Sequence, residues 1–116
     1  MIHLNIGSNL DSIFGSRFDN ISIAVNLLVE SKIKIKKVSN FYETPSYPNQ
    51  KLPKFINIGI LANYEKTISE LMKTIVLIEK KIGRVKTNKN EPRVIDIDII
   101  DFNGFKTRTY NVVLPH

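Results

Sequence analysis

Two aspartates, two residues apart, are the part of the chain whose spacing most clearly suggests chemistry. Asp96 and Asp98 lie in the run Pro92–Phe102, whose Ile and Val content predicts a β-strand, and Asn103-Gly104 predicts a tight turn after it. Strand alternation places both carboxylates on one face, roughly 6.5–7 Å apart. Aspartate is disfavoured in strands and like charges repel, so a divalent cation between the carboxylates would offset the cost. An amphipathic strand with a solvated face explains the same pattern.

An arginine at the entrance of this strand shifts the interpretation towards function. Arg93 follows Pro92 and precedes Asp96 by three residues, where its guanidinium can reach a phosphate that the metal also holds. Asp101 falls out of the alternation, onto the apolar face, so we expect the strand to end there.

The composition limits the class of protein. With 116 residues, 42% hydrophobic and 24% charged, residues 1–116 are predicted to form a single globular domain. No apolar run approaches the roughly 20 residues of a membrane span, and the first residues do not resemble a signal peptide, so no membrane association is expected. The absence of cysteine excludes disulfides and thiolate metal sites and fits a cytoplasmic protein. With two histidines and no cysteine, no zinc site is expected.

The formal net charge is +6, and the basic residues are concentrated between residues 32–37 and 79–93. Such clusters attract polyanions, either a nucleoside triphosphate or a nucleic acid, and charge alone does not separate the two.

Hydrophobic periodicity and capping signals predict the regular elements. Capping boxes begin helices at Ser16 and Thr67, and Gly83 ends the second helix. Alternation predicts strands on either side of each helix. The first helix carries an apolar stripe of Phe18, Ile21, Val25 and Leu28.

In chain order the predicted elements are strand Ile2–Ile6, helix Arg17–Ser31, strand Ile33–Tyr42 with a bulge at Lys36-Lys37, loop Thr44–Lys54 and strand Phe55–Tyr64. They continue with a helix from Thr67 to Gly83, loop Arg84–Glu91, the aspartate strand, and weak β structure over Phe105–Leu114.

The order strand, helix, strand, strand, helix, strand predicts an α+β, ferredoxin-like βαββαβ fold, with an antiparallel sheet and both helices on one face. The other face is then open to a ligand, and Asp96, Asp98 and Asn57 are expected to point there. No Gly-rich phosphate loop or nucleophile triad occurs. The acidic pair, its arginine approach and two long loops suit phosphoryl or pyrophosphoryl transfer.

The sequence also resembles a known family, the 6-hydroxymethyl-7,8-dihydropterin pyrophosphokinases of folate biosynthesis. The resemblance extends over the whole chain in the family's order, through Ile6-Gly7-Ser8-Asn9-Leu10, Ser39–Pro45, Phe55-Ile56-Asn57, Glu79 with Gly83-Arg84, Pro92-Arg93 with Asp96-Ile97-Asp98, and Leu114-Pro115-His116.

The resemblance implies transfer of the β,γ-pyrophosphate of ATP to the hydroxymethyl group of the pterin, with two Mg²⁺ ions and ATP as co-substrate. Asp96 and Asp98 would be the metal ligands and, with Arg84 and Arg93, the catalytic residues. The loops Thr44–Lys54 and Arg84–Glu91 would fold over the substrates.

The implied binding residues fall into two groups. The pterin pocket would consist of Thr44, Pro45, Phe55 and Asn57, and the nucleotide would contact Glu79, Arg84, Arg93 and His116.

Three features depart from the family pattern. Asn90-Glu91 replaces the usual Trp before Pro-Arg, and Val76 replaces a polar nucleotide contact. Family members continue past their Pro-His pair. A chain that is C-terminally shortened in this way is a fragment, a minimal variant or a relative that has lost activity, and the sequence leaves these three interpretations open. Two alternatives stay open: a basic ferredoxin-like module that binds nucleic acid, and a degenerate homologue that binds pterin or nucleotide without turnover.

Overall fold

The computed structural model of the chain describes residues 1–46, 51–85 and 92–106. These residues form an α+β fold, as predicted. Its elements are β1 (Ile2–Ser8), α1 (Arg17–Glu30), β2 (Lys34–Val38), β3 (Tyr42–Thr44), β4 (Phe55–Asn63), α2 (Ile68–Ile82), β5 (Asp96–Phe102) and β6 (Phe105–Lys106).

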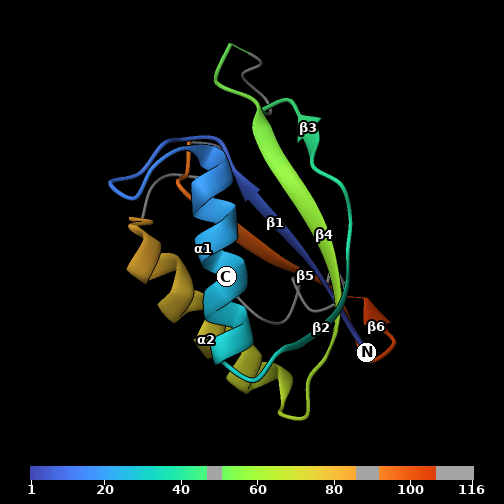
Figure 1. Cartoon of the computed structure of the whole chain (residues 1–116). Helices are drawn as coiled ribbons and strands as arrows, with labels where there is room; N and C mark the ends of the chain where they lie inside the picture. The colour runs from blue at the N-terminus through green and yellow to red at the C-terminus, as the bar shows by residue number, and fades with distance from the viewer. Residues whose placement is uncertain (47–50, 86–91, 107–116) are drawn as a thin grey trace.

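All strand pairs are antiparallel, in the order β2-β4-β1-β5-β6, with β3 pairing with β4. β1 therefore lies at the centre of the sheet, between β4 and β5. The helices α1 and α2 lie side by side over one face (Figure 1). The order of β2, β4, β1 and β5 is the ferredoxin-like arrangement, and it leaves the second face of the sheet, called here the open face, free of helices.

Residues of β1 show how the two faces divide. Ile2, Leu4 and Ile6 are fully buried beneath the helices, whereas His3 and Asn5 alternate with them and are only partly buried. The core is continued by alternate residues of β4 and β5 and by one stripe of each helix. Its buried hydrophobic residues include Ile21, Ala24, Leu28, Ile58, Ile60, Leu71, Ile75, Ile78, Ile82, Ile95 and Ile97.

Both predicted capping boxes are confirmed. Ser16 accepts a hydrogen bond from the backbone N–H of Asp19, and Thr67 does the same for Glu70. Gly83 ends α2 with φ of 111°, a left-handed conformation that glycine adopts without strain. These local signals explain why both helices begin within a residue of their predicted starts.

The predicted apolar stripe of α1 is partly wrong. Phe18 is 45% exposed, and its ring packs edge-on against Phe41 with the ring centroids 5.0 Å apart. The fully buried polar residue Asn20 takes a place on the stripe instead, because its carboxamide bonds to the loops at the end of the sheet.

The predicted strand Ile33–Tyr42 is two strands, β2 and β3, separated by three residues. Ser39 explains the break, since its hydroxyl accepts the Gly59 N–H at 2.8 Å in place of a backbone carbonyl. The chain thus leaves the ladder and rejoins β4 further along, at Tyr42. The register shift between Ile35 and Lys37 confirms the predicted bulge.

The prediction that the aspartate strand ends at Asp101 is wrong, because β5 continues to Phe102. The register with β1 shifts: Leu4 pairs with Ile99 and His3 pairs with Asp101, so Ile100 is an extra residue in a bulge. This bulge reverses the alternation and brings Asp101 onto the open face, where Lys106 Nζ lies 2.7 Å from its Oδ2. Asn103 and Gly104 form the predicted turn, both with positive φ.

Beyond β6 the predicted β structure lies outside the described residues. Neither helix is long and apolar enough to cross a membrane, among the parts of the chain described.

Candidate functional site

The open face brings the predicted site residues together where β1 ends and β4 and β5 begin. Gly7 pairs with Asn57 on one side and with Asp96 on the other, and Asn5 likewise pairs with Gly59 and Asp98. Neighbouring strands are about 4.8 Å apart, so Asn57 and the aspartates stand roughly 10 Å apart across β1. Residues from three distant segments thus form one surface.

The aspartate side of this surface is a network of charges. Arg84 Nη1, just past the end of α2, lies 2.5 Å from Glu79 Oε2 and 3.1 Å from Asp96 Oδ1. Arg93 Nη1 lies 3.6 Å from the other oxygen of Asp96. Both arginines predicted to balance phosphate charge therefore pair with Asp96.

Glu79 connects α2 to β5. Its Oε2 accepts the backbone N–H of Ile97 at 2.9 Å, on the edge of β5 not covered by β1. Burial raises the pKa of the Glu79 carboxyl, against the lowering effects of the Ile97 N–H and the Arg84 guanidinium. The structure thus shows Glu79 supporting Arg84 and the start of β5, while its predicted contact with a nucleotide stays a prediction.

Asp98 is the most perturbed acid described. Burial, and then the negative charges of Asp96 and Glu79, raise its pKa to about 7. An acid that resists ionisation beside another carboxylate is one whose charge a cation would stabilise, so the pair fits a divalent metal ion. The described residues contain no group of three or more acidic or histidine side chains that could hold a metal. Mg²⁺ is commonly held by one or two carboxylates together with substrate phosphates.

Arg93 carries unused hydrogen-bonding capacity. Its Nε is buried and has no acceptor among the residues described. A buried donor without a partner is costly, and an anion bound beside it would remove that cost.

The opposite side of β1 carries neutral polar groups. Asn57 is only 5% exposed, and its Nδ2 donates to Thr44 Oγ1 at 2.9 Å while its Oδ1 accepts from Asn5 Nδ2 at 3.3 Å. A Cβ at Gly7 would lie 2.7 Å from Asn57 Oδ1, which shows that this carboxamide reaches over Gly7 towards β5. Phe55 flanks it, with a ring carbon 3.3 Å from the same position.

The remaining predicted residues are less completely placed. Thr44 and Phe55 pair at the meeting of β3 and β4, both partly buried, and Pro45 follows Thr44 and is exposed. His116 lies outside the described residues, as do residues 47–50 and 86–91 of the two predicted covering loops.

Sequence reasoning missed two buried asparagines that hold the loops around the site. Asn9 accepts the Arg93 N–H at 2.6 Å and donates to Ser46 Oγ at 3.0 Å, so it joins the two loops that flank the surface. Asn20 donates to the carbonyls of Leu10 and Val94. A signal for Asn20 existed: it precedes Ala24 and Leu28 by four and eight residues, on the buried stripe of α1.

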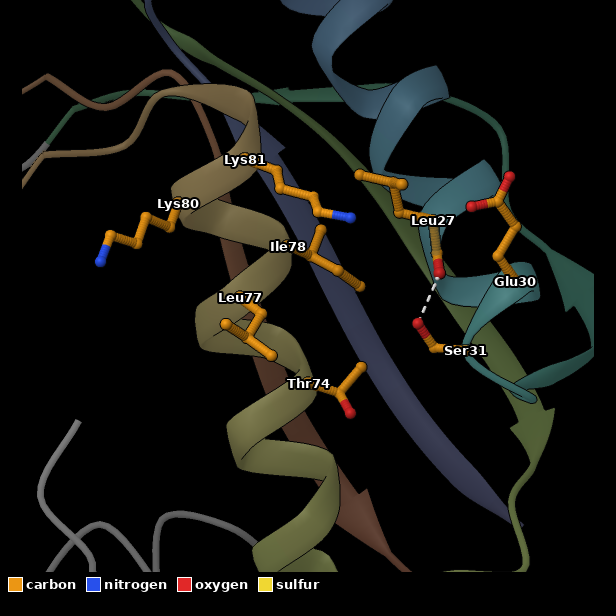
Figure 2. A pocket seen from close by; sticks show the side chains of 8 residues that line it. All are labelled: Leu27, Glu30, Ser31, Thr74, Leu77, Ile78, Lys80 and Lys81. Atoms are coloured by element: carbon orange, nitrogen blue, oxygen red, sulfur yellow. Dashed lines mark hydrogen bonds between the residues drawn. The ribbon is translucent and has the colours of Figure 1, made fainter.

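A separate groove of about 440 Å³ lies between the two helices, on the covered side of the sheet. Figure 2 shows Lys81 directed across it towards α1 and Lys80 directed away. None of the predicted site residues lines it. Its lining residues are Leu27, Glu30, Ser31, Thr74, Leu77, Ile78, Lys80 and Lys81.

The fold and this surface define a ferredoxin-like protein with an acidic pair and arginines at one end of its open face. The sequence matches the model of the 7,8-dihydro-6-hydroxymethylpterin-pyrophosphokinase (HPPK) family over residues 3–116. The chain belongs to this family.

Similar proteins agree with this assignment. The chain is 35% identical over 116 residues to the folic acid synthesis protein FOL1 of Dictyostelium discoideum, covering 100% of the chain and 17% of that protein. It is 34% identical over 112 residues to a mitochondrial folate synthesis bifunctional protein of Pisum sativum, covering 96% and 21%. It is 32% identical over 115 residues to a 2-amino-4-hydroxy-6-hydroxymethyldihydropteridine pyrophosphokinase of Aquifex aeolicus, covering 99% and 69%. The chain thus spans about a fifth of the first two relatives.

Proposed function

We propose that this chain transfers pyrophosphate from ATP to 6-hydroxymethyl-7,8-dihydropterin, a reaction of folate biosynthesis. The observation that carries the proposal is that Gly7 pairs with Asn57 on one side and with Asp96 on the other. The Asn57 carboxamide and the pair Asp96 and Asp98 therefore lie on either side of a residue that has no side chain. Family membership and the name of the Aquifex relative support the choice of substrates.

The proposed reaction is an in-line displacement. The pterin hydroxyl oxygen attacks the β-phosphorus of ATP, the bond from that phosphorus to the oxygen bridging it to the α-phosphate breaks, and AMP leaves with the bonding electrons. The hydroxyl proton passes to solvent. Catalysis of such a transfer is mostly positioning and charge stabilisation, and the structure offers groups for both.

The pterin is placed on the neutral side of the open face. Asn57 is proposed to bind the polar edge of the ring, with Phe55 beside it and Thr44 and Pro45 at the margin. Because the Asn57 carboxamide already points over Gly7, a ring bound there has its hydroxymethyl group on the side of the aspartates.

The polyphosphate is placed on the charged side. Asp96 and Asp98 are proposed to hold two Mg²⁺ ions, which would neutralise the phosphates and orient them for displacement. Arg84 and Arg93 would then exchange their bonds with Asp96 for bonds with phosphate oxygens, and the buried Nε of Arg93 would gain an acceptor. Glu79 and His116 are proposed to contact the nucleotide. A single domain working in the cytoplasm stays a prediction.

The test is direct. Purified protein is mixed with ATP, Mg²⁺ and hydroxymethyl-dihydropterin, and AMP is measured against a reaction without pterin. Pterin-dependent AMP formation supports the proposal. If the intact gene product forms no AMP, the catalytic claim fails, and calorimetry with each ligand then distinguishes a degenerate homologue that still binds from a protein that does not.

Binding of nucleic acid is not favoured. Two basic clusters raised that possibility. The lysines of β2 lie exposed on the edge strand, where charge protects a sheet against pairing with another chain. Residues 86–91 of the lysine-rich loop, the other cluster, lie outside the described residues. The acidic pair on the open face also opposes a phosphate backbone in the absence of metal.

A further inference from the structure

A chain of side-chain hydrogen bonds crosses the open face from β3 to β1 and then to β4. The Tyr42 hydroxyl donates to Asn5 Oδ1, and Asn5 Nδ2 donates to Asn57 Oδ1 at 3.3 Å. Asn57 Nδ2 in turn donates to Thr44 Oγ1 at 2.9 Å. Asn5 is the only one of these four residues that belongs to the central strand, and both bonds of its side chain go to residues of β3 and β4.

The backbone fixes the direction of this chain of bonds. The Tyr42 carbonyl, which is only an acceptor, lies 3.4 Å from Asn57 Nδ2 and thus sets which end of the Asn57 carboxamide is the NH₂ group. Its oxygen then faces Asn5 and requires a donor there. Asn5 supplies its own NH₂ group, and its remaining oxygen accepts the Tyr42 hydroxyl. Each group therefore has one assignment that satisfies its neighbours.

This arrangement leaves a particular capacity unused. Asn57 Nδ2 already has acceptors within the protein, which are Thr44 Oγ1 and the carbonyls of Tyr42 and Phe55, and one lone pair of its Oδ1 is occupied by Asn5. The second lone pair of Oδ1 is left for a ligand. The carboxamide so held presents an acceptor, over Gly7, to a ring N–H or an exocyclic amino group.

We propose that Asn5 is a positioning residue of the heterocycle subsite, which fixes the Asn57 carboxamide so that its oxygen accepts from the N–H edge of a flat, amide-like ring. The inference rests on the proposed function and deepens it, because it assigns the recognition of that ring to a pair of residues on two strands. Asn5 pairs with Asp98 of β5 in the strand register, yet its NH₂ group is directed away from β5, to Asn57 on β4.

The experiment is a double-mutant cycle on ligand affinity. Hydroxymethyl-dihydropterin is titrated calorimetrically into the intact protein with Mg²⁺ and a non-hydrolysable ATP analogue present, for wild type, Asn5→Ala, Asn57→Ala and the double variant. His3→Ala is the matched control, since His3 lies on the same face of β1 and its partner on β4 is Leu61 rather than a residue of the site. Titration of the ATP analogue alone and circular dichroism serve as independent readouts of the nucleotide site and the fold.

We expect Asn5→Ala to weaken pterin binding about 5- to 10-fold, as for the loss of one buried hydrogen bond, and His3→Ala to change it less than 2-fold. In the Asn57→Ala background, Asn5→Ala should add less than a 2-fold loss, because there is no carboxamide left to orient. Affinity for the ATP analogue should change less than 2-fold in Asn5→Ala.

Other results overturn the inference. Losses that multiply in the double variant would show that Asn5 acts independently of Asn57, and equal losses for pterin and ATP analogue would show a general structural role. Pterin binding by wild type with undiminished binding by Asn5→Ala rejects the role of Asn5 alone. Absence of pterin binding by wild type rejects the proposed function, and the assignment of Asn5 with it.

Discussion

The two sides of the open face satisfy their polar groups to very different degrees. Around Asn57, on β3 and β4, the side chains are neutral and each meets a partner within the protein. Around Asp98, on β5 and the end of α2, three carboxylates and two guanidinium groups are crowded together. There the pKa of Asp98 is raised to about 7, and Arg93 Nε has no acceptor in the described part of the chain.

The difference indicates whether each side of the open face has its polar groups satisfied before or only after a ligand binds. A satisfied network of neutral groups is rigid before any ligand arrives, and so provides a preformed surface. A cluster in which carboxylates face one another is stabilised when counter-charges bind, which in the proposed function are a cation between the aspartates and phosphates beside the arginines. Substitutions on the neutral side should therefore change affinity for the pterin, and those on the charged side should change turnover.

The largest effect is expected on the charged side. Asp98→Asn should lower turnover about 1000-fold, because it removes a ligand for a metal that stabilises the transferred charge. The measurement is the rate of AMP formation with saturating substrates. Asp101→Asn is the control, since Asp101 lies on the same face of β5 but pairs with Lys106, away from the site, and should retain activity within about 2-fold. Equal activity of Asp98→Asn and wild type would contradict the metal site.

On the neutral side, Asn57→Ala should weaken pterin binding roughly 10- to 100-fold, because the ring loses its partner and Thr44 loses a buried donor. Affinity for a non-hydrolysable ATP analogue should change little, since Asn57 lies across β1 from the aspartates. Calorimetry with each ligand measures both constants. A loss of the same size for the nucleotide would show that the two sides are not separate subsites.

The unfavourable charge around Asp98 should also be visible in stability without ligands. In the unfolded chain this carboxyl ionises near the ordinary aspartate pKa of 3.8, and in the folded protein its pKa is about 7. The folded state therefore holds the additional proton between these values, so the free energy of unfolding should decrease as the pH rises from about 4 to 7, then level off. At about 1.4 kcal/mol per unit of pKa difference the expected loss is on the order of 4 kcal/mol, and the raised pKa of Glu79 acts in the same direction.

Urea unfolding of the apo protein from pH 4.5 to 8.5 measures this slope. Asp98→Asn should flatten it and should be more stable than wild type at pH 8, since it removes a charge facing Asp96 and Glu79. Addition of Mg²⁺ with an ATP analogue should raise the stability of wild type more at pH 8 than at pH 5. Parallel pH curves for wild type and variant would refute the assignment of the slope to Asp98.

Local patterns were sufficient for the helices and for the faces of the strands. The capping boxes at Ser16 and Thr67 and the glycine at residue 83 act within a turn of the helix end, so neighbouring residues determine them. The alternation in β4 likewise depends on one face being buried, and Asn57 lies on the face of the strand opposite to that of the core residues Ile56 and Ile58.

Features that depend on a partner segment could not be predicted. The bulge at Ile100 exists only in relation to β1, and it reverses the face of Asp101. The role of Asn9 likewise depends on Arg93, which is distant in sequence and donates its backbone N–H to the Asn9 side chain. In the candidate site, residue types and faces could be inferred, whereas the hydrogen bonds that orient Asn57 and the ion pairs of Arg84 required the structure.

The smallest effect is expected at Gly7, where the absence of a side chain leaves space between Asn57 and the aspartates. Gly7→Ala should weaken pterin binding roughly 5-fold, because its Cβ would lie 2.7 Å from Asn57 Oδ1 and must displace the carboxamide. Gly59→Ala is the matched control on the same face: its Cβ would meet His3 Nε2 at 3.5 Å, an ordinary contact, so binding should stay within about 2-fold. Calorimetric pterin titration measures both. If the two variants bind pterin equally well, the space over Gly7 does not matter for the ligand, and the neutral side is not the preformed surface that its hydrogen bonds indicate.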